Sequence, residues 1–85
     1  MDLKLNGKVA LVTGAGSQVG FGKGICMALA EAGCDIVVND VDKEGAAKTA
    51  ADVEAMGRRS MVAVADVTKV TEVKNMVDEA LKKFG

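Results

Sequence analysis

The stretch Val9-Ala10-Leu11-Val12-Thr13-Gly14-Ala15-Gly16-Ser17-Gln18-Val19-Gly20-Phe21-Gly22 decides the fold, because an apolar run passes directly into a glycine-rich loop. Residues 9–12 are apolar on both faces, as in a central parallel strand that helices cover on both sides. Gly33 stands where a left-handed residue would end a helix near Ala32. Between the glycine loop and Gly33, the apolar residues have the spacing of one helix face. We expect this face to be buried and to contain Phe21, Ile25, Ala28, Leu29 and Ala32.

The same pattern of a short β-branched run followed by a helix occurs twice more. Residues 36–38 predict a second strand, and a helix is expected over 43–56 with Asp42 as its N-cap and Gly57 as its stop. Residues 60–65 predict a third strand. A last helix follows, and its apolar face is expected to contain Val70, Val73, Val77, Ala80, Leu81 and Phe84.

This alternation of strands and helices predicts an α/β fold with a parallel sheet and right-handed crossovers. The order β-α-β-α-β-α is the first half of a Rossmann-like, doubly wound parallel sheet, with strand order 3-2-1. The 85 residues contain no proline, no low-complexity segment and no linker-like break. They are therefore expected to form the N-terminal part of one dinucleotide-binding domain over 1–85, with no internal boundary.

Composition excludes several functions. The 11 basic and 12 acidic residues are spread along the chain and form no basic stripe, and two phenylalanines provide no stacking platform, so nucleic acid is not an expected partner. No run of about 18 apolar residues is present, which predicts no membrane span. The N-terminus lacks the basic segment followed by an apolar segment that is typical of a secretory signal, which favours a cytoplasmic location.

The residues that usually carry catalysis are scarce. There is no histidine or tyrosine, so the usual general bases and acids are missing, and no catalytic residue is assigned. Cys26 and Cys34 are eight positions apart, which is not a metal-ligand spacing, so no metal site is predicted. Both are expected to be buried free thiols.

The polar residues that remain gather at the carboxyl ends of the predicted strands, where ligands bind in such sheets. The glycine loop after the first strand suits a pyrophosphate, because backbone N–H groups and a helix N-terminus can approach it closely. Asp40 stands 26 positions after Gly14, near the spacing at which an acid accepts hydrogen bonds from an adenosine ribose. Asp40, followed by the non-basic Val41, would repel a 2′-phosphate, so NAD is predicted over NADP. Asp66 suits either an adenine contact or a turn.

Lys8–Gly14, the glycine loop, Ala28–Gly33, Asn39-Asp40 and Asp66-Val67-Thr68 resemble the N-terminal third of the short-chain dehydrogenase/reductase family. The family's cofactor motif is TGxxxGxG. The resemblance implies that Asp40 and Val41 lie at the ribose, and that Asp66 and Val67 lie at the adenine. It also implies contacts to the pyrophosphate or nicotinamide half by Gly14, Ser17, Gln18, Gly20, Phe21 and Gly22.

The glycine loop departs from the family motif by two additional residues. Five residues separate Gly14 from Gly20, where the motif has three. A gapless match would place Gln18 and Gly20 on the last two motif glycines. We favour the excess in the loop, because two additional helical residues would turn the predicted apolar face about 200° away from the core.

The second departure concerns activity. The family's catalytic asparagine, serine, tyrosine and lysine are not found in this sequence, so the 85 residues alone are expected to be inactive. The resemblance implies an NAD-binding fragment of an oxidoreductase that interconverts a secondary alcohol and a ketone and forms a homo-oligomer. Two alternatives stay open: a non-catalytic nucleotide-binding or assembly module, and an S-adenosylmethionine-dependent methyltransferase.

Overall fold

The computed structural model describes residues 5–17 and 20–85, and within them three strands alternate with three helices. Every predicted element is present, with ends within one or two residues of those expected. Strand β2 is longer than predicted because it also includes Asp35 and Asn39-Asp40. The elements are β1 (Val9–Val12), α1 (Phe21–Glu31), β2 (Asp35–Asp40), α2 (Lys43–Ala55), β3 (Ser60–Val64) and α3 (Val70–Phe84).

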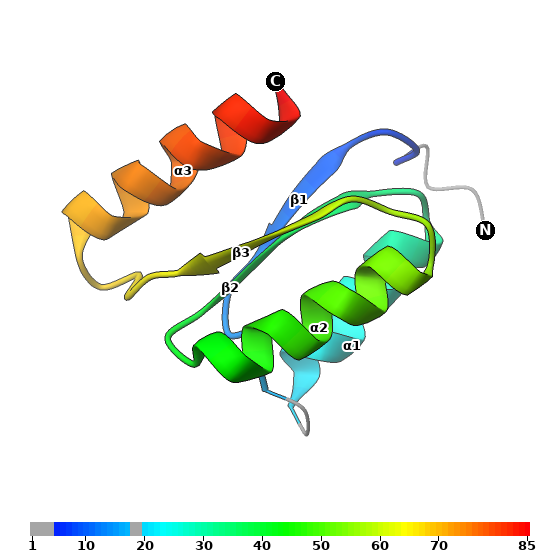
Figure 1. The fold of residues 1–85 in the computed structure, drawn as a ribbon, viewed down its shortest axis with the longest axis horizontal. Coiled ribbons are helices and arrows are strands. Elements are labelled where there is room, and N and C mark those ends of the chain that lie inside the picture. The colour runs from blue at the N-terminus through cyan, green and yellow to red at the C-terminus, as the bar shows by residue number, and fades with distance from the viewer. Residues whose placement is uncertain (1–4, 18–19) are drawn as a thin grey trace.

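The three strands form one parallel sheet in the order β1-β2-β3, which confirms the predicted order 3-2-1. Val9 pairs with Asp35 in the first ladder, and Ile36 pairs with Ser60 in the second. Helices α1 and α2 cover one face of the sheet and α3 covers the other (Figure 1). All three strands therefore end at the same edge, where the glycine loop begins.

Strand β2 is the centre of the core because both of its faces are covered. Ile36 and Val38 face α1 and α2 and belong to a cluster that contains Cys26 and Val53. Val37 points to the opposite face and packs in a second cluster with Ala63, Ala65 and Met76 of β3, the loop that follows it and α3. This arrangement accounts for the uninterrupted apolar run in the middle of β2.

The turns follow the residues that predicted them. The Asp42 side chain caps α2 by accepting a hydrogen bond from the Gly45 N–H at 3.3 Å. Gly33 and Gly57 have φ angles of 99° and 87°, the left-handed conformation expected of helix stops. Cys26 and Cys34 are free and buried, as predicted, and burial raises the pKa of the Cys26 thiol to about 11. Within the described residues, no helix is long and apolar enough to cross a bilayer.

The predicted core face of α1 is wrong in part. Phe21 is 91% exposed, Ile25 is 49% exposed and Ala28 is also exposed. The buried side chains of α1 are instead Cys26 and Ala30. Leu29, which belongs to the predicted face, is partly buried and packs with Met27 against the cluster that contains Cys26, whereas the side of α1 that carries Phe21 and Ile25 faces outward.

The predicted face of α3 is also shifted. Met76 is the buried residue of this helix, with Val73, Ala80 and Phe84 partly buried beside it. Val70, Val77 and Leu81, which we expected on the buried face, are exposed. The side of α3 that carries Met76 packs against β2 and β3, and the neighbouring side lies above β1 without filling the space there.

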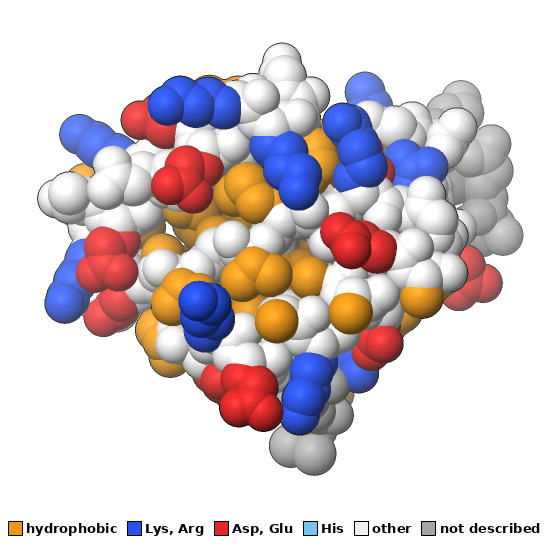
Figure 2. Space-filling model, in the orientation of Figure 1, with side chains coloured by type: hydrophobic (Ala, Val, Ile, Leu, Met, Phe, Trp, Pro, Cys, Tyr) orange, Lys and Arg blue, Asp and Glu red, His pale blue; other side chains and the backbone are white. Residues whose placement is uncertain are grey.

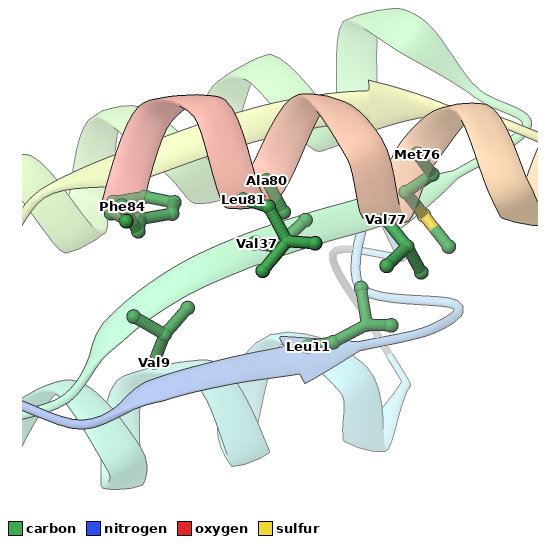
Figure 3. Close-up of a pocket in the computed structure, with 9 residues that line it drawn as sticks. Val9, Leu11, Val37, Met76, Val77, Ala80, Leu81 and Phe84 are labelled. Atoms are coloured by element: carbon green, nitrogen blue, oxygen red, sulfur yellow. The ribbon is translucent and has the colours of Figure 1, made fainter.

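An apolar groove of about 230 Å³ therefore separates α3 from β1. Val9 and Leu11 project from β1 toward Val77 and Leu81 of α3 (Figure 3). In the space-filling view, apolar side chains are exposed between the charged ones (Figure 2). This groove lies beneath α3, on the face of the sheet opposite α1 and α2. The groove is lined by Val9, Leu11, Val37, Met76, Val77, Ala80, Leu81, Phe84 and Gly85.

Candidate functional site

The candidate site lies at the edge of the sheet where the three parallel strands end. The Ala15 N–H donates to the Asn39 carbonyl at 2.9 Å, which joins the glycine loop to β2. The Ala65 N–H donates to the Asp40 carbonyl at 3.3 Å, which joins the end of β3 to β2. These two bonds bring the glycine loop, Asp40 and Asp66 to one edge.

The glycine loop depends on two glycines for different reasons. Gly14 has a φ angle of 64°, a left-handed conformation that a side chain would strain. Gly22, in the first turn of α1, packs so closely that a Cβ there would lie 2.2 Å from the Gly14 carbonyl oxygen. Only a residue without a side chain allows α1 to begin directly against the end of β1.

The start of α1 is open toward this loop. Gly20 is the N-cap residue and gives no side-chain hydrogen bond to the helix, and no acidic side chain lies in its first turn. Ser17 and the side chain of Phe21 are exposed beside it. Gln18, which was also singled out from the sequence, lies outside the described residues. The N-terminus of α1 thus lies beside the glycine loop, and its partial positive charge suits an anion.

Helix α2 supports the loop from behind, and the sequence patterns did not indicate this. The Thr49 hydroxyl is buried and donates to the Ala15 carbonyl at 2.8 Å. Gly45 approaches Gly16 so closely that a Cβ on Gly45 would lie 2.2 Å from the Gly16 carbonyl oxygen. The loop is thus held by α2 as well as by the strand from which it comes.

Asp40 lies at the end of β2 and faces the glycine loop. Its Oδ2 accepts a hydrogen bond from the Gly16 N–H at 2.9 Å, and its Oδ1 accepts one from the Asp42 N–H at 3.0 Å. The N–H of Asp42 is the largest cause of a lowered pKa at Asp40, and the N–H groups of Gly16 and Val41 add to it against the opposing effect of partial burial. The carboxyl group is therefore ionised at neutral pH, and Val41 is exposed beside it.

Asp66 lies at the same edge, but its carboxylate forms hydrogen bonds with a residue only two positions away. Its Oδ1 accepts hydrogen bonds from the hydroxyl and the N–H of Thr68, at 2.6 and 2.9 Å. The Thr68 hydroxyl is the main cause of a lowered pKa at Asp66, with the Thr68 N–H next. The structure thus shows the turn that was one of the two expectations for this acid. Val67 is about half exposed next to it.

Asn39 positions this edge, and its role was missed at the sequence level. Its side chain is buried, and its Nδ2 donates to the carbonyls of Ala63 and Ala65 at 3.0 and 3.2 Å. A polar residue at the end of an otherwise apolar strand was the available signal. These bonds fix the end of β3 against β2 and so place Asp66 near Asp40.

The chemistry that these residues can perform is binding rather than bond making. Among the residues that the structure describes, no group of three acidic or cysteine side chains is arranged to hold a metal ion. The groups that face the site are backbone N–H donors, two ionised carboxylates and exposed apolar side chains. This combination suits a ligand with an anionic centre, hydroxyl groups and a flat apolar part.

Comparison with known proteins agrees with the geometry. The sequence matches the family described as short chain dehydrogenase over residues 8–85. It is 48% identical over 82 residues to a hydroxynaphthalene reductase-like protein of Metarhizium robertsii, covering 95% of this chain and 30% of that protein. It is 38% identical over 85 residues to a cyclohexanol dehydrogenase of Acinetobacter sp., covering 100% of this chain and 33% of that protein.

A solved structure shows the same arrangement of elements. The NAD⁺-bound xylitol dehydrogenase superposes with a TM-score of 0.89 at 39% identity, covering 96% of this chain and 31% of that one. The chain thus spans about a third of the length of the relatives that it matches. The matched part is the half-sheet that carries the glycine loop and Asp40. The chain belongs to the short-chain dehydrogenase family and corresponds to its N-terminal, cofactor-binding region.

Proposed function

We propose that this chain is the NAD-binding part of an oxidoreductase that interconverts a secondary alcohol and a ketone. One observation carries the proposal: the ionised carboxylate of Asp40 lies against the glycine loop, 2.9 Å from the Gly16 N–H. A pyrophosphate bound at the loop would therefore have a ribose-binding acid next to it. NAD supplies the hydride acceptor in such a reaction.

The residues would hold the dinucleotide in three parts. Asp40 would accept hydrogen bonds from the adenosine ribose, with Val41 beside it, and Asp66 and Val67 would flank the adenine. The remaining contacts, to the pyrophosphate and the nicotinamide half, would come from Gly14, Ser17, Gln18, Gly20, Phe21 and Gly22. The close packing of Gly22 on Gly14 supports placing the two additional loop residues before Gly20.

The catalytic step would need residues that this sequence does not contain. A tyrosine that exchanges a proton with the substrate oxygen is required by this family's chemistry, and the 85 residues contain none. The chain by itself is therefore expected to bind NAD without turning over an alcohol or a ketone. A cytoplasmic location stays a prediction from the sequence.

Cofactor choice gives the direct test. Asp40→Ala is expected to lower the ratio of NAD to NADP affinity by about tenfold or more, because a charge-assisted hydrogen bond is lost and repulsion of a 2′-phosphate is relieved. Calorimetric titration with both dinucleotides measures this ratio. Asp78→Ala, which removes an exposed acid on α3, is the control for net charge. NADP binding equal to or tighter than NAD binding by the unaltered chain would contradict the proposal.

Titration of the unaltered chain with NAD and with S-adenosylmethionine separates the alternatives. A methyltransferase would bind S-adenosylmethionine, and an assembly module would bind neither S-adenosylmethionine nor a dinucleotide. Membership of the dehydrogenase family favours NAD over both.

We also propose that the chain is homo-oligomeric, and for the 85 residues the exposed surface favours pairing through β1. Among the residues that the structure describes, only β2 pairs with this strand, and the strand's sequence carries no charge or proline to protect its other edge. Val9 and Leu11 are 44% and 47% exposed and line the apolar groove. A second copy would present the same strand and the same groove across a two-fold axis, extending the sheet to six strands.

Sedimentation at micromolar concentration tests this association. The unaltered chain is expected to sediment as a dimer, and Leu11→Lys is expected to shift it toward the monomer because a charge would enter the apolar groove beside the paired strand. Val64→Lys is the matched control, since Val64 is 50% exposed on β3 at the opposite edge. A folded monomer of the unaltered chain would rule out pairing through β1.

A further inference from the structure

We infer that Asp40 has a second role: its carboxylate anchors the glycine loop through the Gly16 N–H before any dinucleotide binds. This inference rests on the proposed function for its consequence, although the anchor itself is a property of the ligand-free chain. The two residues are 24 positions apart, and the contact between Asp40 Oδ2 and the Gly16 nitrogen is 2.9 Å. A contact over that separation joins two segments that only the tertiary fold brings together.

The carboxylate is itself held in one orientation. Its other oxygen, Oδ1, accepts from the Asp42 N–H at 3.0 Å, so both oxygens have N–H partners. Asp42 in turn accepts from the Gly45 N–H, which fixes the start of α2. Asp40 is therefore linked by hydrogen bonds both to the glycine loop, through Gly16, and to the start of α2, through Asp42.

The glycine loop and α2 also contact each other directly. Gly45 packs against the Gly16 carbonyl, and a Cβ on Gly16 would lie 2.8 Å from the Ala46 nitrogen and 3.0 Å from the Asp40 Cβ. Gly16 is thus enclosed between the side chain of Asp40 and the first turn of α2. Because glycine loses more conformational freedom than other residues on ordering, such an enclosure removes an entropy cost that a ligand would otherwise meet.

The anchor and ribose binding are compatible at one carboxylate. An ionised carboxylate has about four acceptor positions, and the N–H groups of Gly16, Asp42 and Val41 leave capacity for a ribose hydroxyl group. Asp40 thus acts on the ribose directly and on the pyrophosphate through the loop. Replacing this acid to change cofactor preference would therefore also loosen the phosphate site.

Hydrogen exchange in the ligand-free chain tests the anchor without any cofactor. In Asp40→Ala the Gly16 amide is expected to exchange about tenfold faster or more, relative to the Val38 amide of the central strand, because its charged acceptor is lost. Asp40→Asn keeps one oxygen acceptor and should give a smaller increase. Asp78→Ala should give none. Equal acceleration at Gly16 and Val38 would reflect a general loss of stability and would overturn the anchor, as would unchanged exchange at Gly16.

A ligand analogue then separates the two roles. In an NAD analogue whose adenosine ribose lacks the 2′- and 3′-hydroxyl groups, Asp40 has no ribose partner. If Asp40 also orders the loop, Asp40→Ala is expected to lower the affinity for this analogue several-fold, whereas Asp78→Ala leaves it unchanged. Identical affinity of the unaltered chain and Asp40→Ala for the analogue would limit Asp40 to the ribose and overturn the inference. Failure of the unaltered chain to bind NAD would instead overturn the proposed function, and hydrogen exchange would still decide the anchor.

Discussion

Gly22→Ala is expected to lower NAD affinity on the order of 100-fold and to destabilise the chain by about 1–3 kcal/mol. The added Cβ would lie 2.2 Å from the Gly14 carbonyl oxygen and 2.9 Å from the Ala15 Cα. Both are backbone atoms of the glycine loop that follows β1, so no flexible side chain can move aside. The loop or the helix must shift, and the N–H groups that would face the pyrophosphate shift with it.

Gly24→Ala is the matched control for this prediction. Gly24 lies two residues further along the same helix, and apart from its chain neighbours and the nearby backbone of that helix no described atom lies within 4 Å of the position that its Cβ would take. Alanine has a better helix propensity than glycine, so stability should rise by up to about 1 kcal/mol while NAD affinity is unchanged. Calorimetric titration and urea unfolding of the two variants measure both quantities. Equal NAD affinity for Gly22→Ala and Gly24→Ala would show that the close contact does not shape the binding site.

The elements of the fold could be predicted because their signals are local. A run such as Ile36-Val37-Val38 favours a buried strand whatever its neighbours are, and Gly33 and Gly57 end helices through their own backbone conformation. Asp42 caps α2 through a bond to a residue only three positions away. The parallel order of the strands then follows from the alternation of strands and helices.

The buried faces of the helices were less predictable, because the helical spacing of apolar residues does not indicate which element they pack against. Phe21 and Ile25 have the spacing of a buried face, yet the small residues on the neighbouring side of α1 approach the sheet. In α3 the omission of Met76 from the predicted face had the same origin. Which of two adjacent apolar stripes is buried depends on the shape of the sheet, and that is a tertiary property.

Contacts between distant polar residues could not be predicted from spacing at all. The bond from Thr49 to Ala15 joins residues 34 positions apart, and nothing near either one in the sequence indicates the other. Asp40 was singled out for a ligand, and its bond to Gly16 appears only when the strand ends meet. The sequence thus predicts which residues lie at the candidate site, and the fold determines which protein groups they contact there.

Asp35 illustrates this most clearly, because a buried acid at the start of β2 was not singled out. It is 3% exposed, and its carboxylate accepts from the Arg59 N–H at 2.9 Å and from the Arg59 guanidinium at 2.9 and 3.2 Å. A second guanidinium, that of Arg58, lies 3.1 Å away. Both arginines follow α2, so this acid fastens the connection between α2 and β3 to the central strand.

Asp35→Ala is expected to destabilise the chain by about 3 kcal/mol, because the Arg59 N–H loses its acceptor and two guanidinium groups lose the buried carboxylate that is their counter-ion. In a domain of this size that corresponds to a fall in Tm of roughly 15 °C. Thermal unfolding at pH 7 measures the shift, with Asp78→Ala as the exposed-acid control. Equal Tm values for the two variants would mean that the arginines are as well accommodated by water as by Asp35.

The pH dependence of unfolding provides an independent check on the same group. Burial alone would raise the pKa of Asp35, but the hydrogen bonds from Arg59 and the charges of Arg58 and Arg59 outweigh it, and the net pKa is lowered. A carboxyl group whose folded pKa lies below its unfolded value of about 4 stabilises the fold fully above that value and loses this contribution as the pH falls through the folded pKa. The difference in free energy of unfolding between the unaltered chain and Asp35→Ala should therefore be constant from pH 5 to 7 and shrink below about pH 4. A difference that stays the same down to pH 2 would show that the ionised carboxylate is not what stabilises this connection.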